Sequence, residues 1–238
     1  MKFSAHPDIF DRFPGLILGM VVVTGLDNRQ QNEDLQRKIR EMEEKIQKDF
    51  SSETLSTHPN IQAWRKAYSA FGAKPKKYKS SIESLYRMIL KGIELKSINT
   101  LVDIYNYVSL KHKIPLGGDD LDKVDGNITL CFACGDEPFT PLNSLETETV
   151  KKGEVIYMDE KEVLCRRWNW RECDKTKMTP ESKNAVLVLE GLPPVGRKDV
   201  ESAAEDLSVL VRKFCEGETQ ELFLDVSQQQ REFSFFPQ

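Results

Sequence analysis

The chain has 238 residues, of which 39% are hydrophobic and 30% charged, and its formal net charge is −4. These values are typical of a globular protein and exclude a generally basic protein that coats nucleic acid. No apolar run approaches the roughly 18 residues of a membrane-spanning helix, and the first residues lack the apolar stretch of a signal peptide. We therefore expect a cytoplasmic protein without a membrane segment, with one compact domain over residues 1–226 and a tail over residues 227–238.

The spacing of apolar residues predicts mostly helices in the first half of the chain. Residues 16–25 form a continuous apolar run typical of a buried strand, and residues 30–50 carry apolar side chains at helical spacing. Three further helices are predicted over residues 59–71, 80–91 and 100–113. Proline or capping residues open each of these helices.

The second half is predicted to be mostly strands. Short runs rich in β-branched residues, separated by polar turns, predict strands over residues 128–132, 155–158, 163–166 and 185–189. A last amphipathic helix follows over residues 200–214 and a last strand over residues 221–226. This order indicates an α/β fold of mixed layers (α+β), and not a doubly wound parallel sheet.

The five cysteines are an odd number, which argues against a disulfide framework. Cys131 and Cys134 have the spacing of half a zinc site, but the strand pattern around them points the two side chains to opposite faces. With only three histidines in the chain, buried structural cysteines are favoured over zinc ligands. We expect no metal and no other cofactor.

No familiar catalytic motif is present: the chain lacks a nucleophile elbow, a Walker loop and a dinucleotide-binding glycine fingerprint. Polar residues instead gather around the helix at 100–113 and the glycine turn at 117–119. Asn99, Asp103 and Asn106 are spaced to share one helix face. A buried polar face must be hydrogen-bonded to something, so these residues are candidates for a binding site.

The segment from Arg166 to Arg171 places two tryptophans among three arginines, directly after a predicted strand. Aromatic faces beside guanidinium groups suit a surface that stacks on a base and binds phosphate or carboxylate. Tryptophans that close a core beside solvated arginines are an equally good interpretation of the same residues.

Charge is distributed unevenly. Residues 64–96 contain nine basic and two acidic residues, whereas residues 197–225 contain four basic and eight acidic ones. A basic stripe on an acidic body is expected of a protein that touches a polyanion with one face. A solvated helix face is the alternative, although the dense basic loop at 74–79 favours a binding function.

Three segments resemble a known family, in matching order along the chain. They are residues 98–108, residues 114–116 followed by 120–123, and residues 179–190, and they resemble the editing (B3/B4, tRNA-binding) domain in the β subunit of phenylalanyl-tRNA synthetase. Residues 64–68 and 168–171 are similar to free-standing relatives of that domain. The resemblance covers roughly residues 13–192. It implies a B3/B4-like fold, with helices packed on a β-sheet or sandwich of unusual topology.

The resemblance also implies a site that removes a wrongly attached amino acid from tRNA by ester hydrolysis. Asp103 or Asp119 would orient water or contact the amino group, with Asn106 beside them as a third catalytic candidate. The implied substrate-binding residues are Asn99, Gly117, Gly118, Arg166, Arg167, Trp168, Asn169, Trp170 and Arg171. The implied contacts to tRNA phosphates are Arg65, Lys74, Lys76, Lys77, Lys79 and Arg87.

Two departures from the synthetase pattern change the expected pocket. Gly117 stands where the synthetase domain commonly has a histidine, and residues 168–171 stand near its glycine-rich turn. The rejected amino acid therefore cannot be carried over. Two functions stay open: a deacylase that acts in trans on misacylated tRNA, and a non-catalytic RNA-binding module. A small-molecule site in which the arginines bind a carboxylate is a third.

Overall fold

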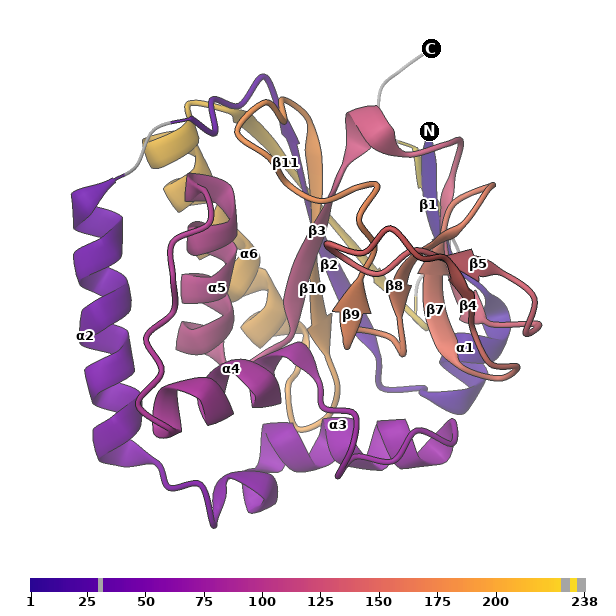
Figure 1. Cartoon of the computed structure of the whole chain (residues 1–238), viewed down its shortest axis with the longest axis horizontal. Coiled ribbons are helices and arrows are strands. Elements are labelled where there is room, and N and C mark those ends of the chain that lie inside the picture. The colour runs from indigo at the N-terminus through magenta and orange to yellow at the C-terminus, as the bar shows by residue number, and fades with distance from the viewer. Residues whose placement is uncertain (30–31, 228–231, 235–238) are drawn as a thin grey trace.

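The computed structural model describes residues 1–29, 32–227 and 232–234 (Figure 1). Its central sheet has four antiparallel strands in the order β11 (Glu218–Asp225), β2 (Ile17–Thr24), β10 (Ala185–Gly191) and β3 (Leu116–Asp120). Strand β2 is almost wholly buried because it is paired on both edges and covered on both faces, as its continuous apolar run predicts.

A second sheet of six strands lies beside the first. Its order is β12 (Glu232–Ser234), β1 (Lys2–Ala5), β4 (Ile128–Phe132), β7 (Val155–Met158), β8 (Val163–Arg166) and β9 (Arg171–Glu172). Strand β12 pairs with β1, so part of the predicted tail belongs to this sheet. Residues 228–231 and 235–238 of that tail lie outside the described residues, as do residues 30 and 31 at the start of the helix predicted over 30–50. A separate small pair joins β5 (Pro138–Phe139) to β6 (Glu148–Thr149).

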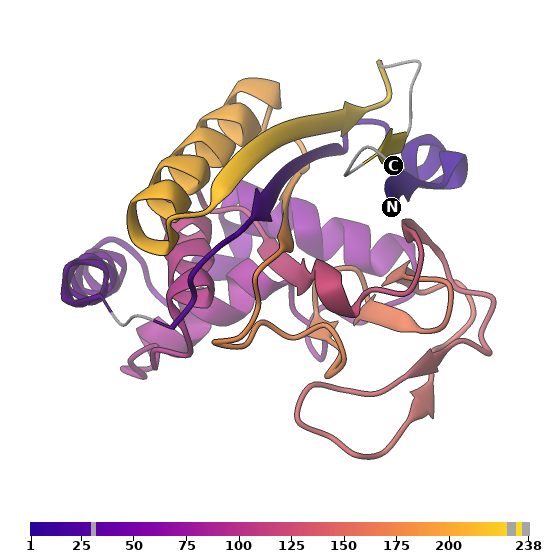
Figure 2. The ribbon, with the colours of Figure 1, turned by 90° about the horizontal axis from the view of Figure 1, so that it is seen from above.

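Six α-helices are described. They are α1 (Pro7–Arg12), α2 (Glu33–Asp49), α3 (Pro59–Ala70), α4 (Ser81–Leu90), α5 (Thr100–His112) and α6 (Arg197–Cys215). Helices α6 and α5 pack against the central sheet, α2 packs on α4 and α5, and α1 packs against β4 of the second sheet. Figure 2 shows α6 running along β11 and β2. Gly19 and Gly191 permit this close packing, because a Cβ atom at either position would lie 2.7 Å from a methyl group of Val200 on α6.

The helices begin where the sequence predicts. The side chain of Asn99 accepts a hydrogen bond from Val102 N, and that of Ser80 accepts one from Glu83 N, so both act as N-caps. Each predicted helix and strand is found within a few residues of its expected bounds, and the mixed α/β fold class is confirmed.

The turn predicted at residues 117–119 is wrong, because these residues form the middle of strand β3. Gly117 and Gly118 pair with Val188 and Leu187 of β10. A Cβ atom at Gly118 would lie 2.5 Å from the side chain of Leu187. Glycine here serves close packing in a strand and not a reversal of the chain.

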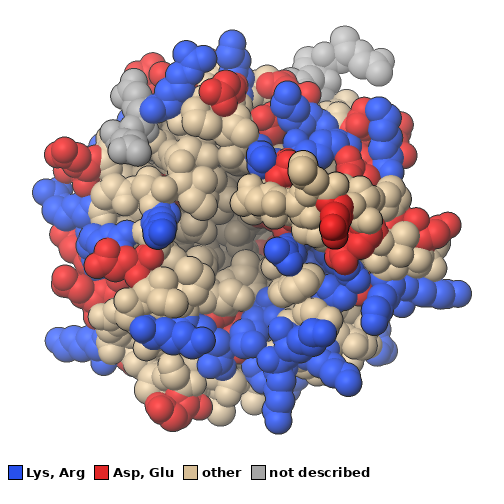
Figure 3. Space-filling view, viewed as in Figure 1, with Lys and Arg blue, Asp and Glu red and all other residues tan. Residues whose placement is uncertain are grey.

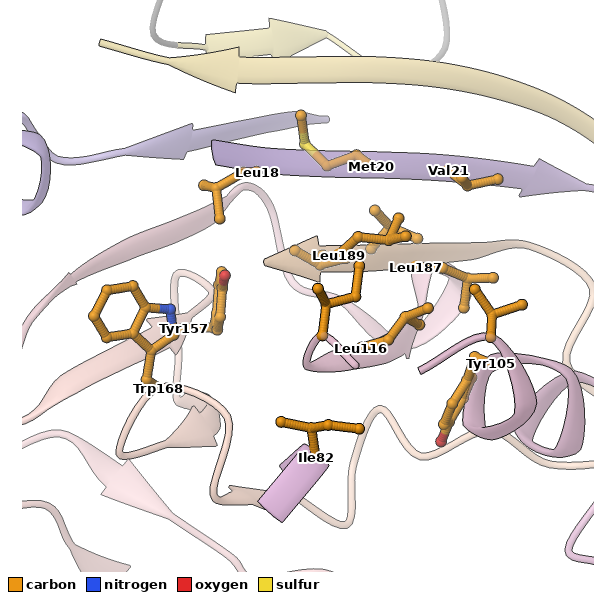
Figure 4. Close-up of a cluster of buried hydrophobic side chains, with 14 of the residues drawn as sticks. Leu18, Met20, Val21, Ile82, Tyr105, Leu116, Tyr157, Trp168, Leu187 and Leu189 are labelled. Atoms are coloured by element: carbon orange, nitrogen blue, oxygen red, sulfur yellow. The ribbon is translucent and has the colours of Figure 1, made fainter. Parts of the chain in front are cut away.

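The hydrophobic core lies between the central sheet, the helices α4 and α5, and the second sheet. Figure 4 shows Leu116, Leu187 and Leu189 of the central sheet near Ile82, Tyr105, Tyr157 and Trp168. Within the described ranges, none of the helices has the length and apolar character that a bilayer span requires.

Candidate functional site

A pocket of about 390 Å³ lies between the two sheets. Its walls come from β3 and β10 of the central sheet, from β7 and β8 of the second sheet, and from residues 168–172. Leu142, Asn143 and Ser81, the first residue of α4, complete the lining. The buried hydroxyl of Ser81 has no hydrogen-bond partner in the described structure. Figure 3 shows this face of the molecule hollowed near its centre, with Lys and Arg side chains along the lower border of the hollow.

Two acidic side chains lie close together at the more open end of this pocket. Burial raises the pKa of Asp119 to about 6, although the hydroxyl of Thr176 donates to Asp119 Oδ1 at 2.5 Å. Burial and the nearby charge of Asp119 raise the pKa of Glu172 to about 8. The Glu172 carboxylate lies over Gly117, where a Cβ atom would be 2.8 Å from Oε1. A larger residue at position 117 would displace this carboxylate.

A third carboxyl group, that of Glu190, lies deeper. Burial raises its pKa to about 7, and Glu190 accepts hydrogen bonds from the hydroxyl of Tyr157 and from Asn169 Nδ2, both at 2.5 Å. Tyr68 donates in turn to Asn169 Oδ1 at 2.9 Å, which fixes the orientation of the amide. Neutral donors thus hold Glu190 in place without neutralising its charge.

The two acidic ends are distinct. The charge of Asp119 contributes to the raised pKa of Glu172, but neither residue contributes to that of Glu190. Cys165 lies between the two ends: burial raises the pKa of its thiol well above the usual range, and all three carboxyl groups add to this effect. The thiol therefore stays protonated and is not a nucleophile at neutral pH.

The arginine–tryptophan segment is divided between the core and the surface. Arg167 and Trp168 adopt positive φ angles of 50° and 68°, which form a tight turn after β8. Trp168 is fully buried and packs against Phe13 and edge-on against Trp64, so the core interpretation holds for this residue, which also lines the pocket. Arg166 is buried in ion pairs with Glu154 and Glu148 and does not line the pocket.

The second half of the segment forms an aromatic and cationic stack at the pocket mouth. The guanidinium carbon of Arg167 lies 3.9 Å from the ring centroid of Tyr78 and 4.6 Å from that of Trp170. The Tyr78 and Trp170 rings meet edge-on at 4.9 Å. Since Trp170 lines the pocket and Tyr78 belongs to the loop at residues 74–79, this stack joins the basic loop to the pocket.

The predicted phosphate-binding residues fall into two groups. Lys74, Lys76 and Lys77 are exposed on the loop, with Lys79 partly buried beside them. Arg65 and Arg87 each contact Glu83 Oε1 at 2.8 Å, and the Glu83 side chain is fully buried. These two arginines are therefore engaged in neutralising a buried carboxylate.

The polar face predicted on the helix at 100–113 does not line the pocket. Asn99 caps α5 and donates to the carbonyl of Met178 at 3.1 Å. Asp103 accepts hydrogen bonds from Gln36 of α2 and from the Ser97 hydroxyl, because this end of α5 packs against α2. Asn106 is half-buried and, like the other two, is not among the lining residues.

The pocket residues that the sequence analysis does not identify include Tyr157, Cys165, Glu172 and Glu190. Glu190 had a signal, because it is a lone carboxylate at the end of an apolar strand. Glu172 had no such signal in the sequence, because its contact with Gly117 depends on how β9 and β3 approach each other in the fold. Across the described ranges, His, Cys, Asp and Glu side chains form no group of three that could hold a metal ion.

Comparison with known proteins places the chain in a family. The family model described as the B3/4 domain matches residues 63–216. The chain is 33% identical over 75 residues to the phenylalanine–tRNA ligase beta subunit of Fusobacterium nucleatum, and 39% identical over 75 residues to that of Colwellia psychrerythraea. Each match covers 32% of this chain and 9% of the relative, so the similarity extends over about a tenth of the length of these subunits.

Among solved structures, a similar one is matched over most of this chain. It is an N-terminal fragment of the phenylalanyl-tRNA synthetase beta-subunit from Pyrococcus horikoshii, with a TM-score of 0.48 and 15% identity, and the match covers 93% of this chain and 53% of that one. The family model itself matches well over half of the chain. The chain therefore belongs to the B3/4 domain family.

Proposed function

We propose that this protein binds the aminoacylated end of tRNA and hydrolyses the ester of misacylated aminoacyl-tRNA in trans. The observation that carries the proposal is the position of the acidic pocket beside the stack of Tyr78, Arg167 and Trp170. The basic loop would contact phosphates, the exposed faces of the stack would meet the terminal base, and the pocket would hold the amino acid. Similarity to phenylalanine–tRNA ligase beta subunits supports tRNA as the partner.

In this proposal Asp119 orients the attacking water and Glu172 accepts the α-ammonium group. A pKa of about 6 leaves Asp119 ionised at neutral pH, as a general base requires. The water oxygen adds to the ester carbonyl carbon while a water proton passes to Asp119. The bond from that carbon to the ribose oxygen then breaks, and the proton passes to this oxygen. Free amino acid and deacylated tRNA leave. Such a base contributes on the order of 10²–10⁴-fold to the rate.

Other candidates from the sequence take supporting roles in the proposal. Asp103 holds α5 against α2 through its hydrogen bond with Gln36, and neither Asp103 nor Asn106 would touch the substrate, because both lie outside the pocket lining. The unpartnered hydroxyl of Ser81, at the N-terminus of α4, is a donor available to a ligand carbonyl.

The test is deacylation of a panel of aminoacyl-tRNAs by the purified protein and by two variants. Asp119→Asn should lower the rate of deacylation at least 100-fold, whereas the exposed control Asp136→Asn should match the unmodified protein. Both variants should retain tRNA binding. Full activity in Asp119→Asn would remove the assigned base.

The alternative is a non-catalytic tRNA-binding module, which the basic loop alone would support. No deacylation of any aminoacyl-tRNA, together with salt-sensitive tRNA binding, would favour it. A small-molecule site for a carboxylate fits less well. Arg166 and Arg167 both pair with Glu154, and an anionic ligand in the pocket would meet three carboxyl groups.

A further inference from the structure

We propose that the pocket is specific for a basic aminoacyl group, such as a lysyl or arginyl group. Glu190 would receive the cationic end of the side chain, and the Asp119–Glu172 pair would face the α-ammonium group. The assignment of an esterified amino acid rests on the proposed function. The preference for a side chain with a terminal cation rests on the pocket itself.

The first argument is the balance of charge. Three carboxyl groups line the pocket, but Arg171 is the one lysine or arginine among the lining residues, and it is exposed next to the Trp170 ring. The nearby cations Arg167 and Lys175 form ion pairs with acidic residues outside the pocket. Within the described part of the chain, no salt bridge reaches Asp119, Glu172 or Glu190.

Buried carboxylates without cations are costly unless they take up protons or a ligand supplies the opposite charge. Hydrogen bonds from a cation to a carboxylate are roughly twice as strong as those between neutral groups. A neutral hydroxyl would donate one bond and leave the charge of Glu190 uncompensated. An ammonium or guanidinium group supplies both several donors and the missing charge. The raised pKa values of Glu172 and Glu190 agree with the lack of a cation beside them, whereas the charge of Lys175 partly offsets the effect of burial on the pKa of Asp119.

The second argument is the spacing of the two acidic ends. The Glu172 carboxylate lies over Gly117, and Gly117 is paired with Val188 of β10. Glu190 lies two residues beyond Val188 on the same face of that strand, which places it about 7 Å further along the sheet. That is about the separation of the two amino groups in an extended lysine. The order of depth agrees, since Glu190 is 2% exposed whereas Asp119 and Glu172 are partly exposed to the pocket.

The third argument is the wall between the two ends. Leu116, Val188 and the ring of Trp168 are among the residues that line the pocket. Apolar walls of this kind cover the methylene stem of a lysine or arginine while its charged end reaches a polar group. A pocket built for a short polar amino acid would leave these walls in contact with water.

The test compares two non-hydrolysable analogues that differ only in the terminal amine. They are 3′-amino-3′-deoxyadenosine with an L-lysyl or an L-norleucyl group in amide linkage on its 3′-amino nitrogen. Calorimetric titration at pH 7 should show at least tenfold tighter binding of the lysyl analogue. Glu190→Gln should remove this preference, whereas Glu172→Gln should weaken both analogues alike. The exposed control Glu181→Gln should behave as the unmodified protein.

The outcomes separate the two proposals. Equal or tighter binding of the norleucyl analogue to the unmodified protein would overturn the preference for a cation. This comparison does not depend on whether the variants fold. Hydrolysis of tyrosyl-tRNA or another neutral aminoacyl-tRNA, without hydrolysis of lysyl- or arginyl-tRNA, would also overturn it and would leave the editing function standing. If neither analogue binds and no aminoacyl-tRNA is hydrolysed, both proposals fail.

Discussion

Arg167 stacks on Tyr78, with its guanidinium carbon 3.9 Å from the ring centroid, and its Nη2 pairs with Glu154 Oε1 at 2.8 Å. This contact joins two segments that are nearly 90 residues apart: the basic loop at 74–79 and the turn after β8. This contact holds the basic loop and its lysines at the entrance of the pocket. The positive potential of the loop lies next to the pocket because Tyr78, which belongs to the loop, is held against the buried Arg167.

Replacing Tyr78 by Ala should release the loop from the pocket mouth. We expect tRNA binding to weaken by three- to tenfold and the KM for deacylation to rise, because lysines that are no longer held in place lose part of their contribution. Tyr78→Phe keeps the ring and should be close to the unmodified protein. Filter binding and steady-state deacylation measure both effects. If Tyr78→Ala leaves both quantities unchanged, the loop is not part of the tRNA site.

Replacing Lys74, Lys76 and Lys77 together by Ala should reduce the salt dependence of tRNA binding. Each phosphate contact contributes roughly 0.7–0.9 to the slope of log K against log salt, so a loss of about 2 is expected for three contacts. The affinity of the small analogues for the pocket should not change, because these lysines do not line it. A double replacement of Lys198 and Lys213 on the acidic helix α6 is the control. The same slope in the triple variant and in this control would exclude the loop as the contact surface.

Arg87→Ala should act on stability and not mainly on tRNA binding. It removes one of two cations that neutralise the fully buried Glu83. The loss in the free energy of unfolding should be on the order of 1–3 kcal/mol, as for a buried charge that loses part of its pairing. Double replacement with Glu83→Gln should recover part of this loss. Denaturant unfolding gives the four values of this cycle, and a fall in tRNA affinity at unchanged stability would restore Arg87 to the phosphate-binding set.

The helices and strands could be predicted because local signals and burial agree in them. Asn99 and Ser80 are caps in both sequence and structure, and the apolar run at β2 is buried on both faces. The sequence predicts a turn where β3 lies, because glycine is rare in strands. Its two glycines are required by Leu187 and Glu172, which come from distant parts of the chain. No local pattern records such a contact.

The candidate site was predictable only where the chemistry is local. The segment from Arg166 to Arg171 was identified from its residue types, yet the structure assigns Trp168 to the core and Trp170 to the pocket mouth. The polar face of α5 predicts a binding site from the burial of its side chains, and this prediction fails because their partners are other parts of the protein. Asp103 is buried and hydrogen-bonded, as expected, but its partners lie on α2 and in the segment before α5. Burial of a polar group indicates that partners exist and does not say whether they are a ligand.

The rate of deacylation should rise with pH through the titration of Asp119. Because burial raises the pKa of Asp119 to about 6, the base is protonated and inactive below that value and ionised above it. We expect kcat to increase about fivefold from pH 5 to pH 6 and about tenfold from pH 5 to pH 7, and to level off above pH 7. The rates are measured over times that keep spontaneous ester hydrolysis small. In Asp119→Asn the remaining rate should lack this step. A profile that is flat between pH 5 and pH 7 would exclude Asp119 as the base.

The stability of the protein should fall as pH rises from about 4.5 to about 8, and Glu172 should account for a measurable share. Its pKa of about 8, raised by burial and by Asp119, means that the folded protein holds a proton that the unfolded chain has already lost over this range. The slope of stability against pH follows the difference in bound protons, unfolded minus folded, and is therefore negative. Glu172→Gln mimics the protonated side chain, so it should match the unmodified protein at pH 5. At pH 9 it should be more stable by on the order of 1–2 kcal/mol, a value reduced because the group faces a water-accessible pocket. Urea unfolding at the two pH values measures the difference.

If Glu172→Gln is destabilised equally at pH 5 and pH 9, Glu172 is ionised in the folded protein and its charge is compensated there. The charge imbalance inferred for the pocket would then be wrong at this residue.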